Sequence, residues 1–505
     1  MPYSEYYMAY DPQTLKKTFN RMRNKIKKYS AESIIDRISH ELNKPDAEQS
    51  TGGMPPHCLL FILRVTFECG HYRERGYKEI KYNQFVEIVN LWHMLNEHVK
   101  MPNEYESVTL WLRVLAHQQF WLQKELKRPD LARLHILFKR PESTHLFNQI
   151  FRDEYKMCIE QFLDIILFLS CFSIVDKNRF IEPEWFNRIS KDYPPELVQN
   201  FFKYASAHFF EHRALFNEGK ATSIHDRVFE HSILRKRPFV TIENPKKYIL
   251  LSRKLLNDFI KNRLYEMLSK PEHKEKFMTK FGPIFQEYMK VGAEYAGFSF
   301  DYEDKVIREK GGKSVDFVVH ERKSKVFIDA KGVEMASKGM LSSSSRIVSD
   351  RLKSSVNSAI LQGFMSNLNY KKVCNEEYEA FLIVVTYKNL YLGSGMDYGD
   401  LVGKDVIKNA RLKSGEKGYI QPNNMFFIDI EEWDALCELV SEKDYSLEDV
   451  LRFARDKSHD MKSKKFMFGQ YLSSINPRIK PPKYLADIFN SEFEKILQIF
   501  TRRNS

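Results

Sequence analysis

Two apolar runs that lie back to back, each with an acidic residue at one end, are the feature that most constrains this chain. The first run follows Asp316 directly, and the second, residues 326–328, is followed by Asp329, Ala330 and Lys331. A short polar connection between the runs is typical of a hairpin turn. Because side chains alternate between the two faces of a strand, Asp329 and Lys331 point to the same side. If the two strands pair, two carboxylates and one ammonium converge at one point.

Two carboxylates beside a lysine suit chemistry on a phosphodiester. Mg²⁺ prefers oxygen ligands and commonly binds one or two carboxylates, water and substrate phosphate. A metal held in this way can activate water, and a nearby lysine can stabilise developing negative charge. The structural alternative is an ordinary strand end with surface charges. Acids and lysine are depleted in strands, so three of them converging there favour a functional role.

The flanking pattern predicts the order in which helices and strands follow one another. Phe277, Phe281 and Phe285 recur at helical spacing, and Gly297 ends that helix. The other predicted elements are a strand at 298–307, a helix at 350–368, a strand at 378–387, a strand at 425–430 and a helix at 431–440. The order is therefore α-β-β-β-α-β, with a later β-α addition.

Residues 275–440 resemble the PD-(D/E)xK nuclease superfamily, which has the restriction-endonuclease-like fold. Asp316 matches the first acid of the motif, with Val315 in place of the proline, and Asp329 and Lys331 match the (D/E)-x-K. The resemblance implies an α/β nuclease core with a mixed central sheet. We expect this core to be joined to a large all-α N-terminal region and a helical C-terminal extension.

The resemblance also implies a set of metal ligands for Mg²⁺ or Mn²⁺. Asp316, Asp329 and the carbonyl of Ala330 would bind the metal. Relatives often carry a further glutamate on the preceding helix. Glu287 is the first choice for that position, and Glu294 is the reserve.

Further residues are assigned to water and phosphate by the same resemblance. Lys331 would position or activate the attacking water, and Gln362 on the helix after the third strand would lie near the phosphate. A Ser-rich segment, residues 342–345, is expected to be either a mobile loop closing over substrate or a flexible linker. Three basic residues after it are expected to reach phosphates: Arg346, Arg351 and Lys353.

The function implied is that of a metal-dependent endonuclease that leaves a 5′-phosphate and a 3′-hydroxyl. DNA is the first choice of substrate, and RNA cleaved by the same site is the alternative. A non-catalytic nucleic-acid-binding protein is a second alternative. Chains of this build are common in bacterial anti-phage and restriction systems, and by this analogy we expect a protein or phage-derived trigger. Many relatives dimerise, although no interface is visible in the sequence.

Two other patterns have the spacing of zinc ligands. His208, Glu211 and His212 spell H-x-x-E-H, an inverted zinc-protease motif. The segment around them is mainly aromatic, so a buried helix is the favoured interpretation. His57-Cys58 and Cys69 with His71 do not have the spacing of a standard zinc finger.

Composition agrees with a polyanionic partner. The chain has 505 residues and a formal net charge of +12, although simple solubility would also explain the charge. Six scattered cysteines favour a reducing compartment over a disulfide framework, and no signal peptide is visible at the N-terminus. We therefore expect a cytoplasmic location. The most apolar run, residues 162–175, is too short to span a bilayer and predicts a buried helix.

Breaks rich in proline and glycine divide the chain into predicted regions. These are a helical recognition or regulatory region at 1–235, a connecting segment at 236–272, the nuclease-like domain at 273–441 and a helical extension at 442–505. The first helix has an apolar stripe formed by Leu15, Phe19, Met22, Ile26 and Tyr29. Its remaining positions are strongly basic: Lys16, Lys17, Arg21, Arg23, Lys25, Lys27 and Lys28. This pattern fits a helix that follows phosphates, a membrane-surface helix or a packed helix with a solvated basic face.

Overall fold

The computed structural model is of mixed α/β type and divides into two compact units. Unit 1 comprises Met1–Glu104, Gln118–Glu272 and Phe489–Ser505, and unit 2 comprises Tyr105–His117 and His273–Ile488. The residues described are 11–44, 54–74, 76–99, 105–175, 180–181, 186, 193–218, 223–230, 232–242, 247–302, 314–335, 337–374, 377–460 and 462–501.

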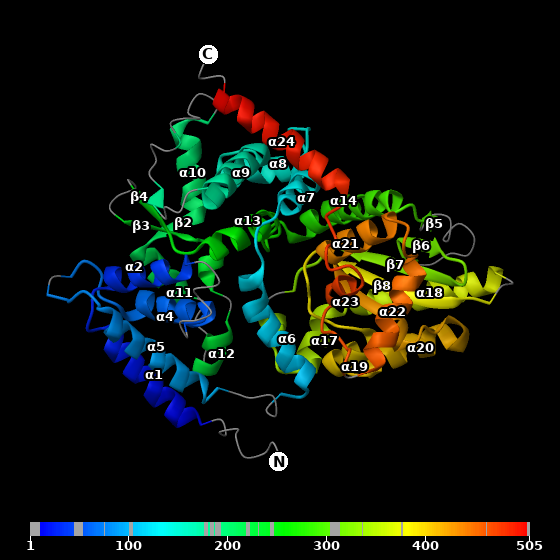
Figure 1. Ribbon diagram of the computed structural model, residues 1–505, viewed down its shortest axis with the longest axis horizontal. Helices are drawn as coiled ribbons and strands as arrows, with labels where there is room; N and C mark the ends of the chain where they lie inside the picture. Colours follow the sequence, from blue (N-terminus) through cyan, green and yellow to red (C-terminus); the bar gives the residue numbers. More distant parts are fainter. Residues whose placement is uncertain are drawn as a thin grey trace. The chain divides into compact units, whose positions relative to one another are not determined.

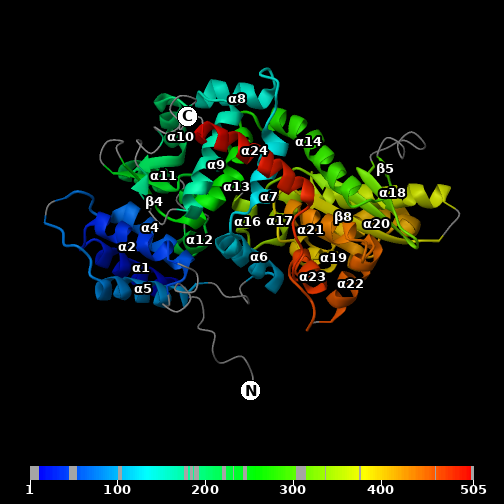
Figure 2. The same ribbon diagram turned by 45° about the horizontal axis from the view of Figure 1, so that its top comes forward.

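Unit 1 is mainly helical. Its helices are α1 (Pro12–Ile26), α2 (Ala31–Leu42), α4 (Pro56–Cys69), α5 (Tyr82–Asn96), α7 (Arg128–Phe138), α8 (Leu146–Tyr155), α9 (Ile159–Val175), α10 (Pro195–Ala205), α11 (Phe209–Glu218), α12 (Ile224–Phe229) and α13 (Arg253–Leu268), with short 3₁₀ turns at Phe120–Gln123 and Ile233–Arg235. Helix α1 packs on α4 and α5, and Figures 1 and 2 both show these three helices side by side. Residues 162–169 of α9 are almost all buried, as their apolar sequence predicts.

The prediction of an all-helical N-terminal region was wrong in one respect, because unit 1 also contains a four-stranded sheet. Its strands are β1 (Phe180–Ile181), β2 (Ser206–His208), β3 (Phe239–Ile242) and β4 (Lys247–Leu250), in the order β1-β4-β3-β2. Strands β2 and β3 are parallel, and the other two pairs are antiparallel. Each strand has four residues or fewer, which is too short for a clear alternation in the sequence.

Unit 2 surrounds a five-stranded mixed sheet. The strands are β5 (Phe300–Tyr302), β6 (Phe317–His320), β7 (Ser324–Lys331), β8 (Glu379–Thr386) and β9 (Met425–Asp429), in the order β5-β6-β7-β8-β9. The first two pairings are antiparallel, and the last two are parallel. The helices are α14 (Lys274–Tyr295), α16 (Ser337–Met340), α17 (Ser345–Leu352), α18 (Val356–Val373), α19 (Gly395–Val402), α20 (Asp405–Gly418), α21 (Ile430–Ser441), α22 (Leu447–His459) and α23 (Phe468–Ile475), with a 3₁₀ turn at Pro422–Asn424.

Two further helices each contain residues of both units. They are α6 (Val108–Gln119) and α24 (Lys483–Thr501). Three helices, α22, α23 and α24, follow residue 442, as predicted. The segment 236–272, predicted to be a connection, contains β3, β4 and α13 and belongs to unit 1.

Helices cover both faces of the five-stranded sheet, which explains why β8 is so apolar. On one face Phe327 contacts Tyr370 of α18, with ring centroids 5.7 Å apart, and Phe427 contacts Tyr398 of α19 at 4.6 Å. On the other face Phe426 contacts α23. A strand buried on both faces reads as a continuous apolar run instead of an alternating one. Figure 1 shows the helices α14, α18, α20 and α21 around this sheet.

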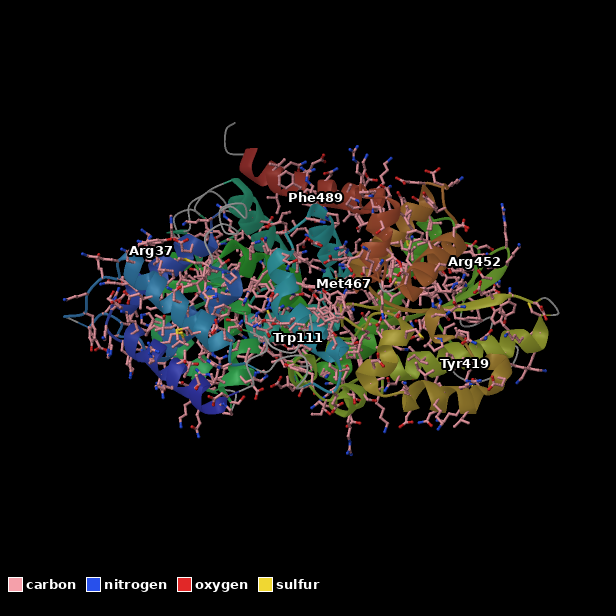
Figure 3. The ribbon with its side chains drawn as sticks, turned by 60° about the horizontal axis from the view of Figure 1, so that its bottom comes forward. Arg37, Trp111, Tyr419, Arg452, Met467 and Phe489 are labelled. Atoms are coloured by element: carbon pink, nitrogen blue, oxygen red, sulfur yellow. The ribbon has the colours of Figure 1, made fainter. Side chains whose placement is uncertain are left out.

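Ion pairs fix the outer helix α22 to the start of β8. Arg452 lies 3.1 Å from Glu379 of β8, and Arg455 also pairs with Glu379. Arg452 lies 2.6 Å from Glu448 within its own helix as well. Figure 3 labels Arg452 on this helix. The pairs are partly exposed, so each contributes little to stability on its own.

Several predicted boundaries in unit 2 needed correction. The helix expected at 350–368 is divided into α17 and α18, because Lys353–Ser355 lie between them. The Ser-rich segment 342–345, expected to be a loop or linker, leads directly into α17, which begins at Ser345. Strand β5 comprises Phe300–Tyr302, so the strand predicted at 298–307 begins two residues later than expected, and its residues 303–307 lie outside the described residues.

Among the residues that the structure describes, no helix combines the length and the apolar character needed to cross a bilayer.

Candidate active site

The two predicted acids and the predicted lysine lie at the ends of neighbouring strands. The last paired residues of β6 and β7 are Phe317 and Ile328, so Asp316 and Asp329 are opposite each other one position further on. The Nζ atom of Lys331 is 2.7 Å from Oδ2 of Asp329. We call Asp316, Asp329 and Lys331 the acid–lysine cluster.

Strand alternation places the lysine on the face of the sheet that α18 covers. Phe327 contacts Tyr370 of α18, and Asp329 and Lys331 follow it at intervals of two residues. Lys331 accordingly donates from Nζ to Oε1 of Gln362, another α18 residue, over 3.0 Å. The structure therefore brings Gln362 to the cluster, as predicted, through the lysine.

Asp316 is held by two donors from different elements. Its Oδ2 accepts a hydrogen bond from the backbone N–H of Ala330, and its Oδ1 accepts one from Nε2 of Gln286, both at 2.6 Å. Burial raises the pKa of the Asp316 carboxyl, and these two donors together with the charge of Lys331 act against that rise. Burial disfavours the charged form, whereas hydrogen bonds and a nearby cation favour it.

The segment that precedes Asp316 is fixed to α18. Ser366 accepts a hydrogen bond from the backbone N–H of Val315 at 3.1 Å, and its hydroxyl lies 3.0 Å from that of Ser314. Nε2 of Gln362 donates to the carbonyl of Ser314 over 3.1 Å. Sequence reasoning missed Ser314 and Ser366. The only available signal was the helical interval between Gln362 and Ser366, which places both on the same side of α18.

The prediction for Glu287 was wrong in its geometry, because the structure does not bring this residue to the cluster. The side chain of Glu287 is 67% exposed, and its Oε1 lies 4.0 Å from the ammonium of Lys290. Glu294, the reserve choice, is 56% exposed and lies 3.8 Å from the same lysine. Burial of Phe285 and Tyr288 turns α14 so that Gln286 approaches Asp316 instead.

The backbone of β7 supports the predicted role of Ala330. Its N–H donates toward Asp316, whereas the carbonyl of Lys331 accepts from Tyr387 on the opposite side of the strand, at 3.2 Å. The N–H and C=O groups of one strand residue point to the same neighbouring strand. The Ala330 carbonyl is therefore directed toward the side on which Asp316 lies.

The three basic residues predicted to contact phosphates are exposed. Arg346 and Arg351 lie on α17, and Lys353 follows its end. Helix α17 packs against α18 and α19. Their contact with phosphates remains a prediction.

The H-x-x-E-H pattern does not form one helical metal site. His208 ends β2, whereas His212 lies in α11. His212 is completely buried, its Nε2 lies 3.3 Å from the carbonyl oxygen of Phe239, and its ring contacts that of Phe67 at a tilt, with centroids 4.7 Å apart. Glu211 accepts a hydrogen bond from the backbone N–H of His208. In the described part of the chain, no group of three or more His, Cys, Asp or Glu side chains is arranged to hold a metal.

Burial of His212 predicts acid sensitivity of unit 1. Burial lowers the pKa of His212 from 6.5 to about 3, so the unfolded state binds more protons between these values. Stability must then fall as the pH falls through this window. Between pH 7 and pH 4.5, wild type should lose about 3 kcal/mol more unfolding free energy than His212→Gln. Urea unfolding at both pH values measures this, and equal losses would contradict it.

The histidines of the second zinc-like pattern, His57 and His71, also contact groups other than a metal. His57 packs edge-on against Trp92, and burial lowers its pKa to about 4. Burial raises the pKa of the neighbouring Cys58 thiol well above its ordinary value. His71 stacks on Tyr77 and lies 2.8 Å from Glu74.

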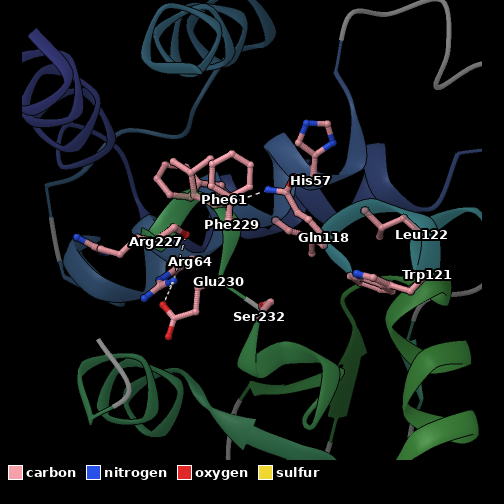
Figure 4. A pocket seen from close by; sticks show the side chains of 12 residues that line it. His57, Phe61, Arg64, Gln118, Trp121, Leu122, Arg227, Phe229, Glu230 and Ser232 are labelled. Atoms are coloured by element: carbon pink, nitrogen blue, oxygen red, sulfur yellow. Dashed lines mark hydrogen bonds and ion pairs between the residues drawn. The ribbon is translucent and has the colours of Figure 1, made fainter. Parts of the chain in front are cut away.

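A small pocket in unit 1 lies beside His57 (Figure 4). Aromatic side chains, including Phe61 and Trp121, form part of its lining. Two buried guanidinium groups belong to its lining: Arg64 lies 2.7 Å from Glu230 and 3.1 Å from Glu68, and Arg227 also pairs with Glu68. The charges in and around this pocket therefore compensate one another, and the pocket has no excess charge to attract an ion.

No family model, curated protein or solved structure matches this chain.

Proposed function

We propose that unit 2 is a metal-dependent nuclease of the PD-(D/E)xK type that hydrolyses phosphodiester bonds, with DNA as the first candidate substrate. The observation that carries this proposal is the acid–lysine cluster at the ends of β6 and β7. Two carboxylates that are at most 9% exposed meet there beside one ammonium. The element order α14-β5-β6-β7, followed after α16 and α17 by α18 and β8, and the mixed sheet support the same assignment.

The donor set suits a hard divalent cation. Asp316 and Asp329 would supply carboxylate oxygens, and the carbonyl of Ala330 is directed toward the same side. One ammonium cannot neutralise two carboxylates, so the cluster carries an excess negative charge when both acids are ionised. Bound Mg²⁺ or Mn²⁺ would supply a water of lowered pKa and offset charge on the phosphate.

The residues around the cluster then have separate tasks. Lys331 would orient water or stabilise charge on the phosphate, and Gln362 holds its ammonium in place. Gln286 and the Ala330 N–H fix the rotamer of Asp316. Because the ammonium of Lys331 already contacts Asp329, a metal that binds to the same carboxylate must compete with that contact.

Cleavage of plasmid DNA and of structured RNA in Mg²⁺ or Mn²⁺, with and without EDTA, tests the proposal. We expect metal-dependent cutting that leaves 5′-phosphates and is lost in Asp329→Ala and Asp316→Ala. Cutting of RNA alone would support the assignment of the site but would show that RNA is the substrate. If neither polymer is cut, or if cutting persists in EDTA or in both variants, the assignment is wrong.

Glu287→Ala is a matched control for the acidic variants. It removes a carboxylate from α14, the helix that also carries Gln286, but its side chain is largely exposed. We expect this variant to cleave at the wild-type rate, which separates loss of the cluster from a general loss of negative charge.

A further inference from the structure

One side of α1 exposes a strip of positive charge. Five exposed cations, which we call the α1 strip, lie on this helix and directly after its C-terminal end: Lys16, Lys17 and Arg21 on α1, and Lys27 and Lys28 after it. Two exposed asparagines, Asn20 and Asn24, lie between them. The sequence contains no acidic residue between Asp11 and Glu32.

Packing of the apolar side of α1 determines which residues form the strip. Leu15, Phe19, Met22 and Ile26 are at most 3% exposed, and α1 packs on α4 and α5. At 100° per residue, these contacts leave a solvent-facing sector of roughly 140° that contains the strip residues of the helix. The strip is therefore a consequence of how α1 is buried.

Neighbouring elements do not neutralise the strip. Lys25, on the edge of the helix, forms an ion pair with Glu87 of α5, and Arg23 lies over the ring of Phe19. Within the described ranges, no ion pair involves any of the five strip cations. Lys17 and Arg21 are four residues apart, an arrangement in which like charges repel each other. A polyanion would relieve this repulsion.

The dimensions of the strip match a phosphate backbone. From Lys16 to Ile26 the helix rises by about 15 Å, and Lys27 and Lys28 follow its end. Duplex DNA carries one negative charge per roughly 1.7 Å of its axis, so several phosphates lie within this length. The amides of Asn20 and Asn24 can donate hydrogen bonds to phosphate oxygens between the cations.

We propose that the α1 strip binds the sugar-phosphate backbone of a nucleic-acid duplex without reading its sequence. As a second contact with substrate it rests on the proposed function of unit 2, but its binding is measured apart from cleavage. A lipid surface fits less well, because an interfacial helix inserts its apolar face, and that face of α1 is buried in protein.

The test measures the affinity of the full chain for a 30-base-pair DNA duplex by fluorescence anisotropy at several salt concentrations, in the presence of EDTA. The variant replaces Lys16, Lys17 and Arg21 with alanine. We expect affinity to fall at least tenfold at low salt. The slope of log K against log salt should decrease by up to about 2.7, since each neutralised phosphate contributes about 0.9.

The matched control replaces three exposed lysines of unit 1 on other elements: Lys127, Lys203 and Lys236. It changes the net charge equally, and circular dichroism checks folding of both variants. Equal affinity and slope in the two variants would overturn the proposal. Strip-dependent binding to vesicles with anionic lipid, but not to the duplex, would also overturn it. If the chain binds the duplex through the α1 strip but cleaves neither polymer, the proposal for the strip stands and the proposed nuclease function of unit 2 is wrong.

Discussion

Lys331→Ala should reduce the rate of phosphodiester cleavage by about 10³-fold while leaving the fold intact, since removing one preorganised charge-stabilising donor typically costs 10²–10³. Lys331 is the cation of the cluster, 2.7 Å from Asp329, and its side chain is partly exposed. Its loss should not weaken metal binding. The ammonium competes with a metal for Asp329, so we expect Mn²⁺ to bind Lys331→Ala at least as tightly as wild type. Single-turnover cleavage and calorimetric titration with Mn²⁺ measure the two effects.

Lys325→Ala provides the matched control. Lys325 is on β7 and on the same face as Lys331, but its ammonium lies over the rings of Tyr370 and Tyr378. We expect cleavage at the wild-type rate in this variant. If Lys331→Ala cleaves as fast as Lys325→Ala, the lysine has no catalytic role. If Asp329→Ala binds Mn²⁺ as wild type does, the metal lies elsewhere.

Arg113→Ala should lower the unfolding free energy of unit 2 by on the order of 3–5 kcal/mol, through orphaned buried acceptors and a cavity. The Arg113 side chain is completely buried, and burial lowers its pKa to about 9. Its guanidinium donates to the carbonyls of Leu390 at 3.1 Å, Gly339 at 2.9 Å and Met340 at 3.3 Å. These carbonyls belong to the segments that follow β7 and β8, so cleavage should fall as well.

Arg411→Ala is the control for this change. Arg411 is also in unit 2, but its side chain is 46% exposed in its ion pair with Glu416. Exposed pairs contribute about 0–1 kcal/mol. Urea unfolding, together with hydrogen exchange of the segments after β7 and β8, measures both variants. If Arg113→Ala unfolds at the same urea concentration as Arg411→Ala, Arg113 does not stabilise unit 2 in the way that we infer.

Several elements of unit 2 were predictable because their signals are local. Strand β6 begins at Phe317 and β7 ends at Lys331, as the two apolar runs predict, and the chain turns between them through Glu321–Lys323. Alternation also placed Asp329 and Lys331 together correctly, and the structure shows their contact. These predictions depend on neighbouring residues and on a period of two, which require no knowledge of the rest of the fold.

The α14 partner of Asp316 was not predicted, although its signal was present. The choice of Glu287 followed the chemistry of carboxylates and ignored the rotation of the helix. Phe281, Phe285 and Tyr288 form the buried stripe of α14, and Glu287 lies away from it. Gln286 is at the edge of the stripe, where an amide can reach Asp316.

The sequence by itself determined the order of the five strands of unit 2, their succession with α14, α18 and α21, and the positions of the acid–lysine cluster, because periodicity and strand ends are properties of adjacent residues. Only the tertiary structure decided what holds the cluster in place. Ser366 and Val315 are 51 residues apart, and Arg113 and Leu390 are 277 apart. Such contacts depend on how whole elements pack and leave no period in the sequence. The same reason applies to the pairing of β2 with β3 in unit 1, because two very short strands gain their stability only from the helices and strands that bury them.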